Sequence, residues 1–235
     1  CDTETVPQCD ELTEKLGGDA RVINMIGNII APGFTAPKIL WLKQHEPENY
    51  QKLKSVLLPH DYLNYWLTGE KTTEFGDASG TAYFDVTRRE WSETILNAIE
   101  PSGGLIDCLP ALIEAKDPCG ELRAEICEEF GFSRGVLVSS GGGDNMMAAI
   151  GTGNVVDGTV TASLGTSGTI FAYASNPVID PKGELAGFCS SSGGWLPLVC
   201  TMNVTVSTEL TRDLFALNIE ELNQRISEAE IGSQG

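Results

Sequence analysis

The sequence predicts an α/β fold in which a helix-rich first part precedes a β-rich second part. Apolar residues recur at helical spacing up to about residue 150, and alternating apolar runs separated by glycine turns follow from residue 159. Hydrophobic residues make up 41% of the 235 residues, which is enough for a folded core. The change of pattern predicts two domains, over residues 1–156 and 157–235.

Helices are expected throughout the first part. The expected segments are 11–16, 21–26, a start at 38–42, then 61–67, 91–99 and 122–130. In the fourth of them, Asp61 is expected to be the N-cap and Gly69 the stop, and Gly131 is expected to end the last of them. Its aromatic side chains, Tyr62, Tyr65 and Trp66, are expected to lie in the core rather than to form a stacking platform.

Strands are expected at 81–84 and at 136–138, where an apolar run predicts a buried strand. From residue 157 a turn (DG) opens the β-rich part, and runs at 159–164 and 169–173 flank a turn of small residues. A further pair of strands is expected on either side of residues 192–194. Helices at about 208–215 and 220–228 follow.

Residues 141–145 (GGGDN) form the most informative motif. The three glycines follow the strand at 136–138 and let the backbone turn sharply and approach a ligand. Residues 146–150 continue as a short apolar helix, so Asp144 lies near a helix N-terminus, where the helix dipole favours a negative charge. The structural alternative is that Asp144 is only a helix N-cap.

A second motif, residues 163–169 (SLGTSGT), is a turn of small residues between two β-like runs. Its glycines, hydroxyls and backbone amides suit phosphate oxygens, although such a turn is often only a hairpin. A carboxylate that can accept a hydroxyl proton and a phosphate-binding turn together indicate phosphoryl transfer to an alcohol.

Net charge, the length of apolar runs and the cysteines exclude several classes of protein. The net charge of −18 repels nucleic acid and anionic membranes, so neither is an expected partner. No apolar run has the length of a membrane span. The seven cysteines form no C-x-x-C pair, so we expect reduced thiols, a cytoplasmic location and no metal site. The two histidines, His45 and His60, are expected to be surface or capping residues.

Five segments, in order, resemble the FGGY carbohydrate kinases, and among these the xylulokinases. They are residues 32–41 (PGFTAPKILW), 56–70 (VLLPHDYLNYWLTGE), 77–81 (DASGT) with 84–86 and 91–92 behind it, 141–145 and 163–168. The resemblance implies an actin-like, ribonuclease-H-like fold of two α/β domains with the sugar and ATP in the cleft between them. This chain would hold most of the first, sugar-binding domain and the beginning of the second, nucleotide-binding domain.

The resemblance also implies roles for individual residues. Asp144 would be the general base that accepts the proton of the attacking sugar hydroxyl, and Asn145 would hydrogen-bond the sugar. Asp2 matches a segment that approaches the sugar in relatives. The nucleotide phosphates would meet Gly165, Thr166 and Ser167.

The activity implied by the resemblance is ATP-dependent phosphorylation of D-xylulose to D-xylulose 5-phosphate, with Mg²⁺ accompanying ATP. Gluconate, ribulose or fuculose as the substrate, and a non-catalytic actin-like binding module, remain alternatives. The family's N-terminal phosphate loop, which anchors Mg²⁺, and its C-terminal adenosine motif are not among these residues. We therefore expect an internal piece of a longer kinase that is inactive alone, and we leave a homodimer open.

Overall fold

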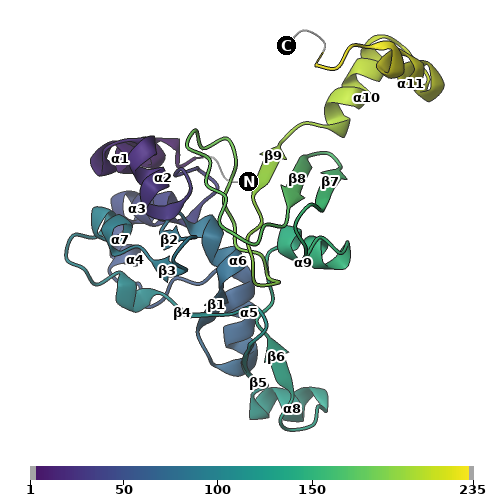
Figure 1. The fold of residues 1–235 in the computed structure, drawn as a ribbon. Coiled ribbons are helices and arrows are strands. Elements are labelled where there is room, and N and C mark those ends of the chain that lie inside the picture. The colour runs from purple at the N-terminus through teal and green to yellow at the C-terminus, as the bar shows by residue number, and fades with distance from the viewer. Residues whose placement is uncertain (1–3, 233–235) are drawn as a thin grey trace. The chain divides into compact units, whose positions relative to one another are not determined.

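The structure is a computed structural model that describes residues 4–232 (Figure 1). It forms two compact units. The first consists of Cys1–Thr161 with Phe171–Leu198, and the second of Ala162–Ile170 with Val199–Gly235. The domain boundary near residue 157 stays a prediction, because compact units and evolutionary domains need not coincide.

Helices at the start of the chain build the main core of the first unit. α1 (Val6–Leu16), α2 (Asp19–Ile26), α3 (Thr35–His45) and α7 (Glu93–Ile99) pack together, and α4 (Pro47–Tyr50) follows α3 (Figure 1). Their apolar faces meet in a cluster of fully buried side chains that includes Leu12, Val22, Ile26, Ile95 and Leu96. The expected helices at 11–16, 21–26, 38–42 and 91–99 are confirmed, and α1 and α3 begin earlier than expected.

The remaining elements of the first unit are short and alternate between strand and helix. In chain order they are α5 (Pro59–Thr68), β1 (Thr72–Glu74), α6 (Phe75–Ala78), the 3-10 helix η1 (Ser79–Thr81), β2 (Phe84–Asp85), β3 (Glu90–Trp91), the 3-10 helix η2 (Ile106–Cys108), β4 (Ala111–Ile113), β5 (Pro118–Glu121), α8 (Ala124–Phe130), β6 (Leu137–Ser139) and α9 (Asp144–Gly151). β1 pairs with β4 in parallel, whereas β2–β3 and β5–β6 are antiparallel pairs.

Glycines end two of these helices where the sequence predicts. Gly69 after α5 and Gly131 after α8 adopt the left-handed conformation, with φ of 90° and 74°. Only glycine takes up this conformation without a steric penalty, and the amide of each then bonds to a carbonyl of the last turn.

Three expectations for the first unit are wrong. Tyr62 and Trp66 are 57% and 47% exposed, because α5 turns Asp61 and Asn64 inward instead. Asp61 is not the N-cap but lies three residues inside the cap, where its carboxylate accepts the amide of Leu58 at 3.1 Å. The strand expected at 81–84 is also wrong, because Thr81 ends the 3-10 helix η1 and only Phe84 of this range lies in β2.

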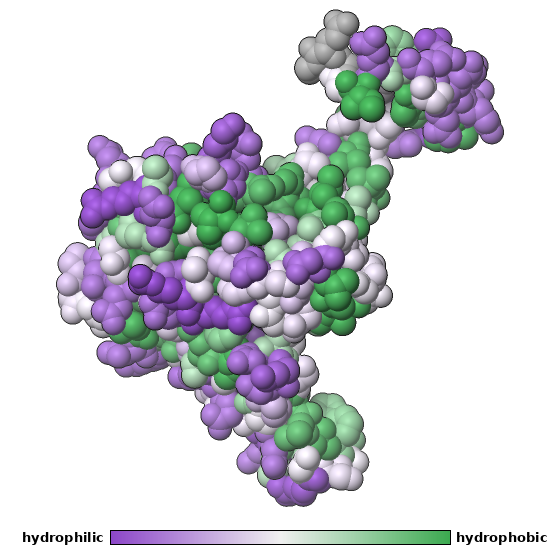
Figure 2. Space-filling view, in the orientation of Figure 1, coloured by the Kyte–Doolittle hydropathy of each residue, from purple (hydrophilic) through white to green (hydrophobic). Residues whose placement is uncertain are grey.

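The strand before the glycines is also more exposed than its apolar sequence predicts. β6 pairs only with β5, so Leu137 is 63% exposed. α8, which lies between these two strands in the chain, exposes Phe130, and the adjoining Phe132 is exposed as well. Figure 2 shows hydrophobic atoms in green beside hydrophilic ones in purple over this helix, at the bottom of the view.

A late segment of the chain completes the first unit. The side-chain amide of Asn28, at the end of α2, pairs with the backbone of Gly187 through two hydrogen bonds of 2.7 Å. Bridges between Cys189 and Trp195 and between Ala186 and Leu198 form the strand pair expected around residues 192–194. Residues 171–198 are therefore part of the same compact unit as the first helices.

The second unit contains the hairpin expected around residues 163–169. β7 (Val160–Leu164), β8 (Gly168–Ala172) and β9 (Leu198–Thr201) form a sheet in that order, and the strands continue from the first unit. The helices α10 (Thr205–Leu214) and α11 (Ile219–Glu228) follow. Asn218 caps α11, because its carboxamide accepts the amide of Glu221 at 2.9 Å.

Two further properties concern the whole described chain. The cysteines at 9, 108, 119, 127, 189 and 200 are free, and four of them (Cys9, Cys119, Cys127 and Cys189) are buried, as expected for reduced thiols. Between residues 4 and 232, no helix combines the length and the apolar character needed to cross a membrane.

Candidate functional site

Three helices of the first unit start beside one another. α6 follows the end of β1, α9 follows β6 through residues 140–143, and α5 is anchored to the same place by Asn64. The Asn64 carboxamide donates to the carbonyl of Ser140 at 2.6 Å, and the Ser140 hydroxyl donates to the carbonyl of Ala115 at 2.9 Å. Ligand sites of α/β proteins form at such carboxyl ends of strands.

Asp144 is the first residue of α9, as the sequence predicts. Its side chain is exposed, and its Oδ1 accepts the amide of Asn145 at 2.8 Å. It forms no ion pair within residues 4–232, and the N-terminal helix amides favour its negative charge. A carboxylate held by its backbone and open to solvent can accept a proton from an incoming hydroxyl.

The three glycines before Asp144 are required by close packing. Gly141 has φ of 76°, and a Cβ atom there would lie 3.2 Å from Cδ2 of His60. A Cβ on Gly142 would lie 2.6 Å from Cε of Met147 and 3.1 Å from Oγ of Ser191, and one on Gly143 would lie 3.0 Å from Sδ of Met146 and 3.4 Å from Oδ1 of Asp77. The segment 141–143, called here the glycine run, therefore packs against polar side chains and against two methionines of α9.

Four titratable side chains beside the glycine run form an acid–histidine cluster of His60, Asp61, Glu74 and Asp77. The imidazole of His60 lies between two carboxylates, with Nδ1 2.6 Å from Oδ2 of Asp77 and Nε2 3.2 Å from Oδ1 of Asp61. Glu74 is fully buried and accepts the amides of Gly76 at 2.7 Å and Asp77 at 2.5 Å. The expectation that His60 is a surface or capping residue is wrong, because its side chain is only 23% exposed.

The pKa values of three members of this cluster, His60, Asp61 and Glu74, are all raised. Burial raises the pKa of Asp61 to about 6, against the effect of His60. Burial also raises the pKa of Glu74, although two amides bond to it. The hydrogen bond to Asp77 raises the pKa of His60 above its usual value, and the other carboxylates act in the same sense. The cluster therefore retains protons that the same groups would release in water.

A serine loop, residues 190–194, closes the other side of the glycine run. Arg89 holds this loop, because its guanidinium donates to the carbonyls of Gly193 at 2.6 Å and Gly194 at 3.1 Å. The same guanidinium lies 4.5 Å from the ring centre of Trp195. A pocket of about 270 Å³ lies here and is lined by residues that include Glu74, Arg89 and Ser191.

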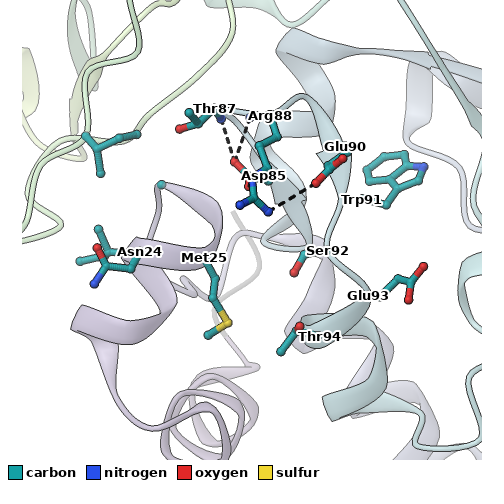
Figure 3. A pocket seen from close by; sticks show the side chains of 13 residues that line it. Asn24, Met25, Asp85, Thr87, Arg88, Glu90, Trp91, Ser92, Glu93 and Thr94 are labelled. Atoms are coloured by element: carbon teal, nitrogen blue, oxygen red, sulfur yellow. Dashed lines mark hydrogen bonds and ion pairs between the residues drawn. The ribbon is translucent and has the colours of Figure 1, made fainter.

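A larger pocket of the first unit lies elsewhere. It has a volume of about 760 Å³ and is lined by α2, the β2–β3 turn and the start of α7 (Figure 3). In it, Asp85 accepts the amides of Thr87 and Arg88, and the Arg88 guanidinium pairs with Glu90 at 3.7 Å. None of the residues predicted to act on sugar or ATP lines this pocket, so its size does not make it the candidate site.

The predicted phosphate turn belongs to the second unit. There Gly165 donates its amide to the carbonyl of Ser167 at 2.9 Å, and the start of α10 holds the turn. The amides of Val204 and Thr205 each donate at 3.0 Å, to the carbonyls of Thr166 and Gly165. The side chains of Thr166 and Ser167 are exposed, as a phosphate-binding turn requires.

The predicted site residues are thus only partly brought together. Asp144 and Asn145 are neighbours in the first unit, and Gly165, Thr166 and Ser167 form one turn in the second. Asp2 lies outside the described residues. Sequence reasoning gave no role to His60, Glu74 and Asp77. The sequence does contain a signal for them. His60 and Asp61 stand at a predicted helix start, and two more acids, Glu74 and Asp77, follow on either side of a glycine.

A resident metal ion has no obvious place in the part of the chain that the structure describes. Between residues 4 and 232, no three His, Cys, Asp or Glu side chains are arranged to hold one. In the acid–histidine cluster, backbone amides already occupy Glu74 and His60 occupies one oxygen of Asp77.

Comparison with known proteins identifies the class. Residues 1–151 match the N-terminal domain of the FGGY family of carbohydrate kinases. The xylulose kinase of Haemophilus influenzae is 49% identical over 235 residues, which cover all of this chain and 48% of that protein. The xylulose kinase of Streptomyces rubiginosus is 40% identical over 219 residues, 93% of this chain and 44% of that protein.

A solved structure agrees with the sequence comparison. The crystal structure of xylulose kinase from Bifidobacterium adolescentis superimposes with a TM-score of 0.85 at 29% identity, covering 97% of this chain and 52% of that one. The chain therefore belongs to the FGGY family of carbohydrate kinases and has their actin-like fold. It spans about half the length of the relatives that it matches.

The substitution Gly141→Ala tests the packing of the glycine run. Gly153→Ala is a matched control, because Gly153 has φ of 75° but open space around the position of its Cβ. Each alanine stores about 1–3 kcal/mol of backbone strain, and only the one at position 141 also meets the His60 ring. Urea denaturation should show a larger loss of stability for Gly141→Ala; equal losses would contradict the described contact.

The pH dependence of stability tests the raised pKa of Asp61. Between its ordinary pKa of 3.8 and about 6, the folded chain binds more protons than the unfolded chain, so the free energy of unfolding falls as pH rises. Asp61→Asn, which keeps an acceptor for Leu58, should flatten this fall by about 3 kcal/mol. Glu93→Gln, at an exposed position of α7, is the control. Parallel curves for wild type and Asp61→Asn would refute the assignment.

Proposed function

We propose that the full-length protein transfers the γ-phosphate of ATP to D-xylulose and forms D-xylulose 5-phosphate. The observation that carries the proposal is the exposed Asp144 at the first turn of α9, in a chain that is 49% identical over its whole length to a xylulose kinase. Membership of the family supports a sugar and ATP as the two substrates. The free cysteines support a cytoplasmic location.

In this proposal Asp144 accepts the proton of the attacking hydroxyl while Asn145 hydrogen-bonds the sugar. Phosphoryl transfer has a loose transition state, so placing the nucleophile contributes more than base strength does. An exposed carboxylate held by its own helix start meets this need.

ATP would place its phosphates on the turn formed by Gly165, Thr166 and Ser167. The exposed hydroxyls of Thr166 and Ser167 support this role, because the turn is otherwise held by α10. We expect Mg²⁺ to enter as the ATP complex, in which it neutralises phosphate charge. A homodimer, and the lack of nucleic-acid or membrane partners, remain predictions.

A coupled assay on the full-length protein tests the substrate. D-xylulose, D-ribulose, L-fuculose and D-gluconate should be compared at equal concentrations with ATP, and D-xylulose should give the highest kcat/KM. A higher value for another sugar would move the protein to a different substrate within the family. Binding of a sugar without turnover of any would favour a non-catalytic module.

The substitution Asp144→Asn should abolish phosphorylation in the full-length protein. Loss of a general base costs about two to four orders of magnitude in kcat, and the substitution preserves the side-chain shape. Asp19→Asn is a matched control, because Asp19 is also an exposed acid that opens an eight-residue helix. Activity of Asp144→Asn within about tenfold of wild type would remove Asp144 from the mechanism.

The substitution Thr166→Val should raise the KM for ATP more than the KM for the sugar, by roughly tenfold. The reason is the loss of a hydroxyl from a turn proposed to face phosphates. Thr211→Val, at an exposed threonine of α10, is the control and should change neither constant. Steady-state kinetics with both substrates varied give the two KM values. A selective rise in the KM for the sugar would mean that the turn faces the sugar and not the phosphates.

A further inference from the structure

The acid–histidine cluster has only one cationic group. Within residues 4–232, no lysine or arginine forms an ion pair with Asp61, Glu74 or Asp77, and the imidazole of His60 alone faces them. Two of the three carboxylates are almost inaccessible to solvent, since Asp61 is 1% exposed and Glu74 is not exposed at all. Such buried charges are tolerated only when paired or hydrogen-bonded, so His60 has an electrostatic task.

His60 and its partner Asp77 both contact the glycine run. A Cβ on Gly141 would lie 3.2 Å from Cδ2 of His60, and one on Gly143, immediately before Asp144, would lie 3.4 Å from Oδ1 of Asp77, so both side chains stand beside the run. The other oxygen of Asp77, Oδ2, is the one that His60 contacts at 2.6 Å. The pair therefore spans the glycine run from its first to its last residue.

Both members of this pair are themselves fixed. His60 is the second residue of α5, whose start is held by the hydrogen bond between Asp61 and Leu58. Asp77 lies in α6, whose start is held by the Glu74 carboxylate through the amides of Gly76 and Asp77. The glycine run, by contrast, has no side chains of its own to hold it.

We propose that His60, paired with Asp77, is a positioning residue that fixes the glycine run and thereby sets the place of Asp144. The inference rests on the proposed kinase function for its catalytic consequence, but the contact itself does not. His60 is not a catalytic residue here, because it acts on Asp144 through residues 141–143. Misplacement of a catalytic group by about 1 Å can cost about a hundredfold in rate.

The pairing also makes the position of Asp144 depend on pH. The groups that face His60 are Asp61 from α5, Glu74 from the end of β1 and Asp77 from α6, and the glycine run adds no charge before Asp144. The pKa of His60 is raised, so the bridge to Asp77 is fully charged below the ordinary histidine pKa and weakens to a neutral hydrogen bond as pH rises through the higher folded value. Activity should therefore fall on the alkaline side.

Two substitutions at position 60 separate charge from hydrogen bonding. His60→Ala removes the ring and its proton, whereas His60→Asn keeps a donor near the place of Nδ1 without a charge. His45→Ala is the control, because His45 is an exposed histidine that contacts only its own helix at Trp41. All variants are made in the full-length protein.

Hydrogen–deuterium exchange over residues 139–145 is the first readout, since it needs no activity. His60→Ala should speed exchange there by at least about tenfold, His60→Asn should give an intermediate rate that does not change with pH across the histidine range, and His45→Ala should stay near wild type. The second readout is kcat with D-xylulose and ATP saturating. It should fall about ten- to hundredfold for His60→Ala, and the alkaline decline of wild type should vanish in His60→Asn.

The outcomes distinguish the two proposals. Exchange and kcat within twofold of wild type in His60→Ala would overturn the positioning role, and so would a fall in kcat without faster exchange at 139–145. If the wild-type protein phosphorylates no sugar, the proposed function fails, and the exchange comparison alone decides whether His60 holds the glycine run.

Discussion

The burial of two carboxylates, those of Asp61 and Glu74, is the constraint on which the site depends. A buried carboxylate is costly unless donors surround it, and the chain supplies backbone amides for both. Glu74 takes the amides of Gly76 and Asp77, so it turns the end of β1 into the start of α6. Asp61 takes the amide of Leu58, so it fixes the start of α5. The two starts then meet through His60 and Asp77.

The glycine run fits into this polar surrounding because it is small. Polar side chains approach it from three directions, from α5, from α6 and from the serine loop held by Arg89. A side chain at any of the three glycine positions would come too close to a neighbouring side chain. The site therefore combines a flexible sequence with a rigid environment, which is how α/β proteins commonly hold functional residues at the ends of strands.

Much of this arrangement could be predicted from the sequence, because residues close together in the chain determine it. The glycine stops at Gly69 and Gly131, the hairpin around residues 163–169 and the place of Asp144 at a helix start follow from short-range chemistry. Membership of the FGGY family follows from ordered segments, and the family comparison confirms it.

Other features depend on contacts between distant parts of the chain, which a local pattern cannot reveal. His60 meets Asp77 and Gly141, from three separate segments, so its burial was not visible in the sequence around it. The same contacts explain why α5 buries Asp61 and Asn64 and exposes Trp66. An apolar stretch such as residues 136–138 predicts a buried strand only if another layer covers it, and β6 has a single neighbour here.

The pairing of Asn28 with Gly187 has a consequence for synthesis on the ribosome. The carboxamide of Asn28 imitates a peptide group, and its partner lies 159 residues later in the chain. The first helices therefore leave the ribosome long before the strand pair that completes their unit exists. Contacts of such long sequence separation slow folding. The early helices expose apolar surface until the strand pair has been synthesised. Nascent chains interrupted before residue 187 would be natural clients of chaperones that bind apolar surface.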